Sequence, residues 1–528
     1  MKFAKRFSKI AAVILSITCL SGIVSCGPKK SPDTPTDLQI HMWKSGLGID
    51  FMNKAIADFK EAYPQYNVNF EFNPAVGTFQ NTIAQGADVN SIALYFFAAT
   101  DMSADVLPFL EPLDSVLDST SNAADRYTIR QRMSESMLDN FIAKDGEYYV
   151  LPYYDSYVGI LYHTDIIDGI NYKLPRTTME LTLLVDELVD DGMKPFIHFA
   201  DFNGGYWNSP MHAWQIQYDG LDAYNEELAW GENEDSNGNR YPTLERLKEK
   251  DGRYEAIKVM RDLIRAETCV DSSNDSDFTG AQTRFLDKEA VMMANGSWLE
   301  NEMKNTNQGA KLGMMKMPVI SSIVDKCDKI KDEIALQGII DAIDAVEGIT
   351  EEDMLKVPLT GATYEASEAD RERIFFARNI AVTAATDNAV AIPNYSTAKE
   401  AAKDFLRFFY SDKNIDNYAS INKMQLPVAY GDGSSDVDTT GWTDFNKEFL
   451  SYRESKFAVS RYTLDMSRIY TISNVNMFAN NLFVRTFANL AGDNTTPDMI
   501  WTQISDAFDA GYNNYVSDAA LGAPVNNA

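Results

Sequence analysis

The fold is decided by the stretch Tyr148–Ile167, whose sequence is YYVLPYYDSYVGILYHTDII. Both halves of this stretch are rich in aromatic and β-branched residues, which favour strands. Pro152 and a cluster of polar and aromatic groups interrupt it, because proline has no backbone N–H to donate inside a sheet. We interpret the stretch as a crossover at which the chain leaves one α/β lobe and enters another. Tyr153, Tyr154 and Asp155 are then expected in a cleft between the lobes.

Each part of this crossover has an expected role. Val150–Pro152 should close the sheet of the first lobe, and Val158–His163 should begin the sheet of the second. At the break, the ring of Tyr153 can stack on a ligand and the carboxylate of Asp155 can accept hydrogen bonds. Strand alternation would point Tyr154 away from the cleft, so we leave it out of the predicted site.

Length and composition agree with two lobes and limit the kinds of partner that the chain can bind. With 528 residues the chain is too long for one core, and two lobes of ordinary size with insertions are expected. Hydrophobic residues make up 45% of the chain and aromatic residues 12%, which is enough to fill such cores. The formal net charge of −30 opposes binding to nucleic acid, to anionic lipid or to a large polyanion.

The N-terminal segment predicts export and a lipid anchor. A basic start precedes a mostly apolar run that ends at Val24 and is too short for a comfortable membrane span. The motif IVSCG around Cys26 resembles a bacterial lipobox, which implies that residues 1–25 are a lipoprotein signal peptide and that Cys26 is lipidated. An ordinary signal peptide with a chance cysteine is the alternative. Residues 26–36 are rich in Pro, Lys and Ser, and we expect a tether between membrane and fold.

The pattern that follows predicts an α/β unit. Apolar and polar residues alternate over 38–42, which indicates a half-buried strand. A helix is expected from a cap at Asp50 to Pro64, and a second strand over 68–72. A buried strand over 92–97 comes next. Strand, helix and strand in this order imply a right-handed parallel connection.

The carboxyl ends of these strands supply candidate ligand-binding residues. In open α/β sheets, ligands bind outside the carboxyl ends of the strands. This rule selects Trp43 and Lys44 after the first strand, and Phe97 and Asp101 at the end of the buried one. The alternative for Trp43 is an ordinary core tryptophan.

Several further elements are expected along the chain. A long amphipathic helix is predicted over 126–143. A later helix should start at Thr177, whose hydroxyl can cap it, and a strand is predicted over 194–199. The loop 203–214 that follows is aromatic and contains Trp207.

Two later segments of the chain are also informative. A strand over 290–294 leads directly to Trp298. Strands over 379–382 and 389–393 bracket a polar loop whose last residue is Asn388, and a strong amphipathic helix is expected over 397–410.

Taken together, these segments resemble, in order, the extracellular solute-binding proteins of the maltose-binding-protein family. The matching segments are the strand end at Trp43 with its helix, YVLPYYDSYVGILYHTDII, LPRTTMEL with DDGMKPF, FLDKEAVMMANGSWL with KMP, and AVAIPNYSTAKEAAKDFLRFFYSDKNIDNYA with LPV. The resemblance implies a two-lobed, periplasmic-binding-protein-like α/β fold of type II, with a hinge of crossover strands between the lobes. It also implies a monomeric, non-enzymatic lipoprotein on the outer face of the cell membrane, with no cofactor, that delivers a mono- or oligosaccharide to the permease of an ABC transporter.

The resemblance also suggests lobe boundaries. The N-terminal lobe is expected to comprise residues 37–152 and about 376–430. The C-terminal lobe should comprise residues 153–375 and 431–528, with acidic insertions and a tail that make the chain longer than is usual for the family.

The predicted site joins aromatic rings, which stack on the apolar faces of sugars, to polar groups that bind hydroxyls. The resemblance places Trp43, Tyr153, Asp155 and Trp298 in the cleft, and Phe97 and Asp101 more loosely. The predicted ligand-binding residues are Trp43, Lys44, Phe97, Asp101, Tyr153, Asp155, Trp207, Trp298 and Asn388.

Two other classes of protein remain open, a secreted lipid-anchored glycoside hydrolase and a surface adhesin. The sequence has no GxSxG, HExxH or Gly-rich phosphate motif, and its four histidines are scattered. The segment 232–241 faintly resembles a calcium loop but lacks the closing acid, so we expect a polar turn and no metal. Cys269 and Cys327 could pair in an oxidising exterior.

Overall fold

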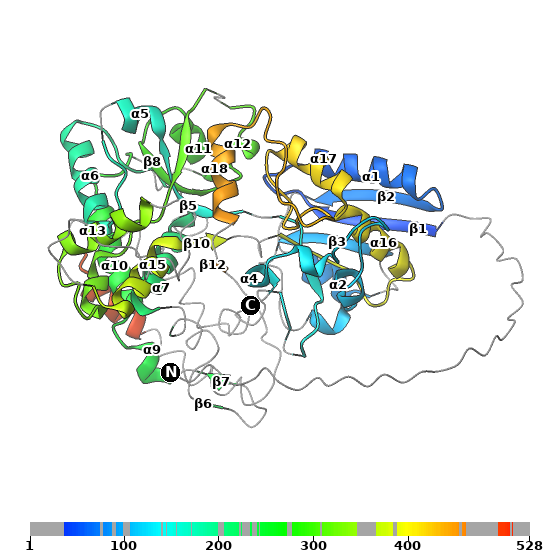
Figure 1. The fold of residues 1–528 in the computed structure, drawn as a ribbon, viewed down its shortest axis with the longest axis horizontal. Coiled ribbons are helices and arrows are strands. Elements are labelled where there is room, and N and C mark those ends of the chain that lie inside the picture. The colour runs from blue at the N-terminus through cyan, green and yellow to red at the C-terminus, as the bar shows by residue number, and fades with distance from the viewer. Residues whose placement is uncertain are drawn as a thin grey trace, which may run out of the picture. The chain divides into compact units, whose positions relative to one another are not determined.

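The structure is a computed structural model of the 528-residue chain (Figure 1). It describes residues 36–73, 78–86, 91–98, 106–138, 141–143, 145–154, 156–169, 172–198, 205–220, 223, 233–234, 240–241, 243–271, 277–306, 309–345, 366–383, 388–453, 457–460, 495–506 and 509. The predicted signal peptide, Cys26, Asp101, Asp155 and the centre of the 232–241 loop therefore lie outside the described residues. Among the helices of the described part, none is long and apolar enough to cross a membrane.

The first sheet has five strands in the order β2-β1-β3-β11-β4. β1 is parallel to both of its neighbours, β2 and β3, whereas β11 is antiparallel to β3 and to β4. The strands are β1 (Thr36–Trp43), β2 (Tyr66–Asn73), β3 (Ile92–Ala98), β4 (Val150–Pro152) and β11 (Asn388–Ala391). The strands predicted near the N-terminus are thus confirmed, including their parallel connection through a helix.

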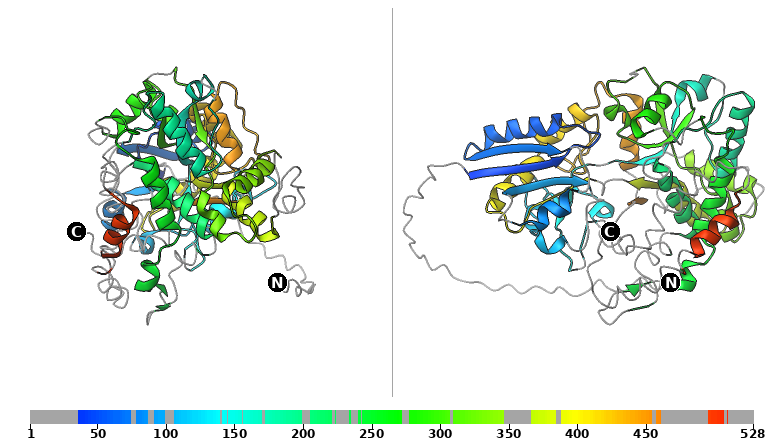
Figure 2. Two further views of the ribbon diagram at one scale, coloured as in Figure 1. Left: turned by 90° about the vertical axis from the view of Figure 1, so that its left-hand side faces the viewer. Right: turned by 180° about the vertical axis from the view of Figure 1, so that it is seen from behind.

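Helices bury both faces of this sheet, which explains why every residue of β3 is buried. Phe96 faces the side covered by α1 and α16, where its ring lies 5.5 Å from Phe409. The next residue, Phe97, points to the opposite face and stacks on Phe79 of α2 at 3.7 Å. The helices of this lobe are α1 (Asp50–Ala62), α2 (Phe79–Ala84), α3 (Asp114–Leu117), α16 (Lys399–Phe409) and α17 (Asp412–Asn422), with a 3₁₀ turn at Leu107–Phe109. Figure 2 shows the early strands and the late helices α16 and α17 side by side.

The second sheet has the order β8-β5-β9, with both outer strands antiparallel to β5. Its strands are β5 (Val158–His163), β8 (Met292–Gly296) and β9 (Leu312–Met315). Around it lie α5 (Thr164–Gly169), α6 (Thr178–Asp190), α7 (Asn208–Asp219), α10 (Gly252–Leu263), α11 (Phe278–Leu286), α12 (Leu299–Glu302), α13 (Glu333–Asp344), α15 (Glu368–Asn379) and α18 (Asp444–Arg453). The predicted cap of α6 is confirmed, because the hydroxyl of Thr177 accepts a hydrogen bond from the backbone N–H of Glu180.

Smaller elements complete the second lobe. They are α9 (Leu244–Leu247), 3₁₀ turns at Gly205–Trp207 and Ser321–Lys326, the hairpin β6 (Asn233–Glu234) with β7 (Arg240–Tyr241), and β10 (Ile380–Thr383) paired with β12 (Phe457–Ser460). Residues 497–506 are helical, and Trp501 packs edge-on against Tyr254 at 5.7 Å. This part of the C-terminal extension is therefore packed into the second core.

Within the described residues, the chain passes between the two cores at three places. β4 belongs to the first sheet and β5 to the second, so the first passage is the break at 153–157. Val382 lies in the second core and Ala389 in the first, which places the second passage after Val382 rather than near the expected residue 376. Trp442 packs in the first core, whereas Phe445 belongs to a third cluster beside the second sheet. The first core therefore extends beyond the expected limit of residue 430.

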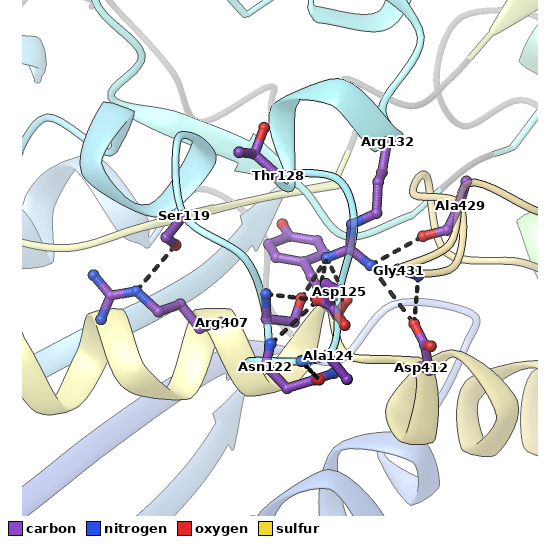
Figure 3. A network of polar contacts seen from close by, with 12 residues as sticks. Ser119, Asn122, Ala124, Asp125, Thr128, Arg132, Arg407, Asp412, Ala429 and Gly431 are labelled. Atoms are coloured by element: carbon purple, nitrogen blue, oxygen red, sulfur yellow. Dashed lines mark hydrogen bonds and ion pairs between the residues drawn. The ribbon is translucent and has the colours of Figure 1, made fainter.

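Three predictions of local structure are wrong. Asp50 does not cap α1, because the N-cap position is Ile49 and no side chain caps this helix. The long helix expected over 126–143 is replaced by a 3₁₀ turn at Arg130–Arg132 and the four-residue helix α4 (Glu135–Leu138). The reason is that Arg132 does not lie on a solvated helix face. Its guanidinium is buried and donates to the carbonyls of Tyr410 and Ala429, each at 3.1 Å (Figure 3). The strand expected over 194–199 is reduced, in its described part, to isolated bridges at Phe196.

The two cysteines of the folded region are unpaired, so the disulfide that the sequence allows is not formed. Both thiols are buried, and burial raises the pKa of Cys269 to about 11 and that of Cys327 to about 12. Because the thiolate is the reactive form, we expect both to be alkylated slowly in the native protein at pH 8 and rapidly after denaturation. Mass spectrometry of alkylated peptides checks this, and a linked Cys269–Cys327 peptide would contradict it.

Candidate functional site

Three aromatic residues meet where the second sheet approaches the first core. Trp298 follows β8, yet its ring is buried in the first core with only 8% exposure. Tyr206 meets it edge-on, with ring centroids 5.1 Å apart, and Tyr154 lies tilted at 6.4 Å. We call Tyr154, Tyr206 and Trp298 the Trp298 cluster. It joins the crossover, the 3₁₀ turn before α7 and the end of β8.

A glycine makes room for the Trp298 ring. A Cβ atom on Gly296 would lie 2.2 Å from two ring carbons of Trp298, a separation that real atoms do not adopt. The indole is therefore folded back over the backbone of β8. Glycine is needed here because the ring and the backbone approach closely, which explains the spacing of the motif NGSW.

Two carboxylates follow Trp298 on the single turn of α12. Glu300 accepts hydrogen bonds from the hydroxyl of Thr443 at 2.6 Å and from the amide of Asn446 at 2.9 Å. Glu302 accepts one from the amide of Gln282 at 2.8 Å. Burial raises the pKa of both carboxyl groups above their ordinary range.

Glu302 also lies against the loop that follows β1. A Cβ atom placed on Gly46 would be 3.1 Å from Cδ and Oε1 of Glu302. This loop carries two of the predicted residues, Trp43 at the strand end and Lys44 immediately after it. Trp43 is half-buried, and Lys44 is exposed with its ammonium 5.9 Å from the ring of Phe72. The structure therefore brings the Trp43–Gly46 segment towards α12.

The side chains of Tyr153 and Asn388 are buried and hydrogen-bond to each other. The Tyr153 hydroxyl donates to Oδ1 of Asn388 at 3.1 Å, and the Tyr153 backbone N–H donates to the Asn388 carbonyl at 3.3 Å. Tyr153 is fully buried, and its ring stacks on Phe51. The pair thus ties the end of β4 to the start of β11. Their assignment to the ligand site stays a prediction.

Two other predicted residues also lie in the cores. Phe97 is fully buried against Phe79. Trp207 is 2% exposed and meets Phe196 edge-on at 5.1 Å in the second core. In this conformation neither side chain faces solvent, whereas Asp101 and Asp155 lie outside the described residues. No group of His, Cys, Asp or Glu within the described part could hold a metal ion.

A small pocket lies beside the Trp298 cluster, where the backbone N–H of Ser297 donates to the carbonyl of Tyr157 at 2.9 Å. It has room for about one water molecule, which is too little for a sugar ring. The pocket is lined by Tyr157, Lys423, Met424, Gln425, Trp442, Asn446, Phe449 and Leu450. We therefore centre the candidate site on the Trp298 cluster, Glu302 and the loop after β1.

Sequence reasoning missed three members of this candidate site. Tyr154 was excluded by strand alternation, but it follows the last residue of β4 and alternation does not apply there. Tyr206 stands in the aromatic loop 203–214, where only Trp207 was selected. Glu302 lies four residues after Trp298, and a charged residue one helical turn beyond a strand end is the signal that could have identified it.

A comparison with known proteins identifies the family to which the chain belongs. A family model described as "Bacterial extracellular solute-binding protein" matches residues 54–429. A comparison with curated protein sequences found no match.

Similar solved structures include RafE in complex with raffinose, at 16% identity and a TM-score of 0.59, covering 90% of this chain and 99% of that one. The bacterial solute receptor AcbH, described as having an exclusive substrate preference for β-D-galactopyranose, is 14% identical with a TM-score of 0.57 and coverage of 90% and 98%. The GacH receptor of Streptomyces glaucescens, solved with and without acarbose, is 14% identical with a TM-score of 0.56 and coverage of 92% and 100%. These likenesses confirm the two-lobed α/β fold that the sequence predicts.

Proposed function

We propose, since the chain belongs to the family of bacterial extracellular solute-binding proteins, that it captures a carbohydrate at the Trp298 cluster. It acts as a binding protein rather than as a hydrolase or an adhesin. The observation that carries this proposal is a tryptophan flanked by two tyrosines, with a half-buried carboxylate four residues further on.

This arrangement suits a sugar for physical reasons. The apolar C–H face of a pyranose ring stacks on an indole, and hydrogen bonds from hydroxyl groups to a carboxylate are charge-assisted and therefore strong. The similar proteins RafE, AcbH and GacH are described with raffinose, β-D-galactopyranose and acarbose, respectively, which supports the same ligand class here.

Binding in this fold requires movement, because Trp298 is only 8% exposed. A ligand can reach the indole face only when the residues that bury it, Tyr154 of the first core among them, move away from Trp298. Hinge motions of this kind use a few residues at element ends. The crossover residues 153–157 are suited to that role.

The second part of the proposed function is delivery of the sugar to a membrane transporter. The protein is anchored by lipid at Cys26, on the outer face of the cell membrane, and the tether ends at residue 35, because Thr36 begins β1. It hands its sugar to the permease subunits of an ABC transporter. The lipobox-like motif and the family support this part of the proposal.

A thermal-shift screen tests the carbohydrate assignment. We expect at least one of raffinose, galactose and a chitin oligosaccharide to raise the melting temperature, because a ligand at 100 times its Kd stabilises the native state by about 2.7 kcal/mol. Product analysis of the same mixtures should detect no hydrolysis. A shift with peptides or polyamines but with no sugar would overturn the proposal, and turnover of the sugar would favour the hydrolase.

A further inference from the structure

The carboxylates of Glu300 and Glu302, both on α12, differ in their hydrogen-bond partners. Glu300 is occupied by two donors, the hydroxyl of Thr443 and the amide of Asn446, so it braces the start of α18. Glu302 receives a single hydrogen bond, from Gln282 to its Oε2 atom. Within the described residues Glu302 forms no ion pair, because the nearby Lys304 faces Asp50 instead, at 3.4 Å.

A half-buried carboxylate without a cation is costly to the fold. Removing a charge from water is unfavourable unless hydrogen bonds or an opposite charge replace the lost hydration. One amide donor replaces only part of that hydration, and it leaves Oε1 without a hydrogen bond among the described residues. Groups with this kind of unfavourable burial are concentrated at functional sites.

The position of Glu302 indicates that it contributes to ligand binding. On one side, its Oε1 atom lies against Gly46, in the loop that carries Trp43 and Lys44. On the other side lies the Trp298 cluster, because the backbone N–H of Glu302 donates to the carbonyl of Trp298 at 2.8 Å. Glu302 therefore stands between the loop of the first lobe and the aromatic rings.

We infer that Glu302 is a ligand-binding residue that accepts hydrogen bonds from the hydroxyl groups of a neutral sugar stacked on Trp298, and that it selects neutral sugars over acidic ones. The inference rests on the proposed function and deepens it. A hydroxyl group replaces the hydration that the carboxylate has lost. A uronic acid would instead place a second negative charge in a partly buried space, where repulsion is strong.

Calorimetric titration of the full chain with the sugar that gives the largest thermal shift tests this inference. Glu302→Gln should weaken binding by about 10-fold to 100-fold, since a hydrogen bond to a charged group contributes that factor. The control is Glu300→Gln, which changes the same helix and should leave the affinity within about threefold. The wild type should reject galacturonate relative to galactose, and Glu302→Gln should reduce that discrimination.

The pH dependence provides a second readout. Gln282 and Gly46 face Glu302 and do not titrate, and the nearby Lys304 pairs with Asp50. Tyr154, in the neighbouring Trp298 cluster, titrates far above neutral pH because it is buried, which raises its pKa. Affinity in the wild type and in Glu300→Gln should therefore rise as the pH increases through the pKa of Glu302. In Glu302→Gln this increase should be smaller.

The outcomes are distinct. If the wild type binds a sugar and Glu302→Gln binds it equally well with the same pH profile, the inference about Glu302 is overturned while the proposed function stands. If the wild type binds no sugar, the proposed function fails and the inference falls with it. Should Glu302→Gln fail to fold, Glu302→Asp keeps the charge, and its shorter reach should still weaken binding of the neutral sugar; unchanged affinity would again overturn the inference.

Discussion

Replacing Trp298 with alanine should weaken sugar binding by about 30-fold or more, which corresponds to at least about 2 kcal/mol. The change removes the ring on which the sugar is proposed to stack and which meets Tyr154 and Tyr206. It should also lower the free energy of unfolding, by up to about 3–5 kcal/mol, because the ring is buried in the first core. Calorimetric titration at a temperature where circular dichroism shows a folded protein separates the two effects.

The matched control is Trp214→Ala. Trp214 is also a buried tryptophan, but it lies in the second core, where its indole N–H donates to the carbonyl of Pro318 at 3.1 Å. The Trp214→Ala variant should therefore lose stability with little change in affinity. Gly296→Ala offers a second variant that retains the indole but displaces it, because the added Cβ would lie 2.2 Å from the ring. Equal affinities in Trp298→Ala and Trp214→Ala would remove Trp298 from the site.

The largest expected effect on stability comes from Arg132. Figure 3 shows its guanidinium among the loop around Asp125, the carbonyl of Ala429 and the carboxylate of Asp412. Its side chain is fully buried, and its nearest nitrogens lie 3.9 Å from Asp125 and 3.7 Å from Asp412. Arg132→Met should lower the free energy of unfolding by about 3–5 kcal/mol, because it leaves a buried carboxylate without its cation and removes one donor from each of the carbonyls of Tyr410 and Ala429. Urea denaturation measures this loss.

Arg130 provides the control two residues away. Its side chain is 29% exposed and pairs with Asp114 at 2.7 Å and Asp118 at 2.6 Å. Ion pairs at such exposure contribute about 0–1 kcal/mol, so Arg130→Met should shift the urea midpoint only slightly. Equal losses in Arg130→Met and Arg132→Met would show that the buried network adds nothing beyond a surface ion pair.

The fold is largely predictable because its strands bear clear patterns. β1 follows the alternation over 38–42, and β4 and β5 form on either side of the break at Pro152. The expected helix over 126–143 fails for a physical reason. Its buried side chains, among them Ile129, Met133 and Leu138, have a nearly helical spacing, but the pattern cannot show that Arg132 turns inward.

The candidate site is less predictable, since it is assembled from distant segments. Trp298 can be recognised at the end of a strand, but its partners Tyr154 and Tyr206 come from other elements. Strand-end rules also selected Phe97, whose ring is used to cover the sheet. Periodicity shows that a residue is apolar and in a strand, but it does not show whether helices bury one face or both.

The strand order of the first sheet has a consequence for synthesis. β11 is inserted between β3 and β4, although most of the second lobe separates it from β4 in sequence. The lobe made first therefore keeps an unpaired edge along β3 until residue 391 has been added, and its core is closed only by Trp442. At about 5–20 residues per second, a ribosome needs about 15–60 s to extend the chain from Ala98, the end of β3, to Ala391, the end of β11. During this interval the nascent chain exposes an apolar edge strand, so its safe maturation depends on protection from aggregation.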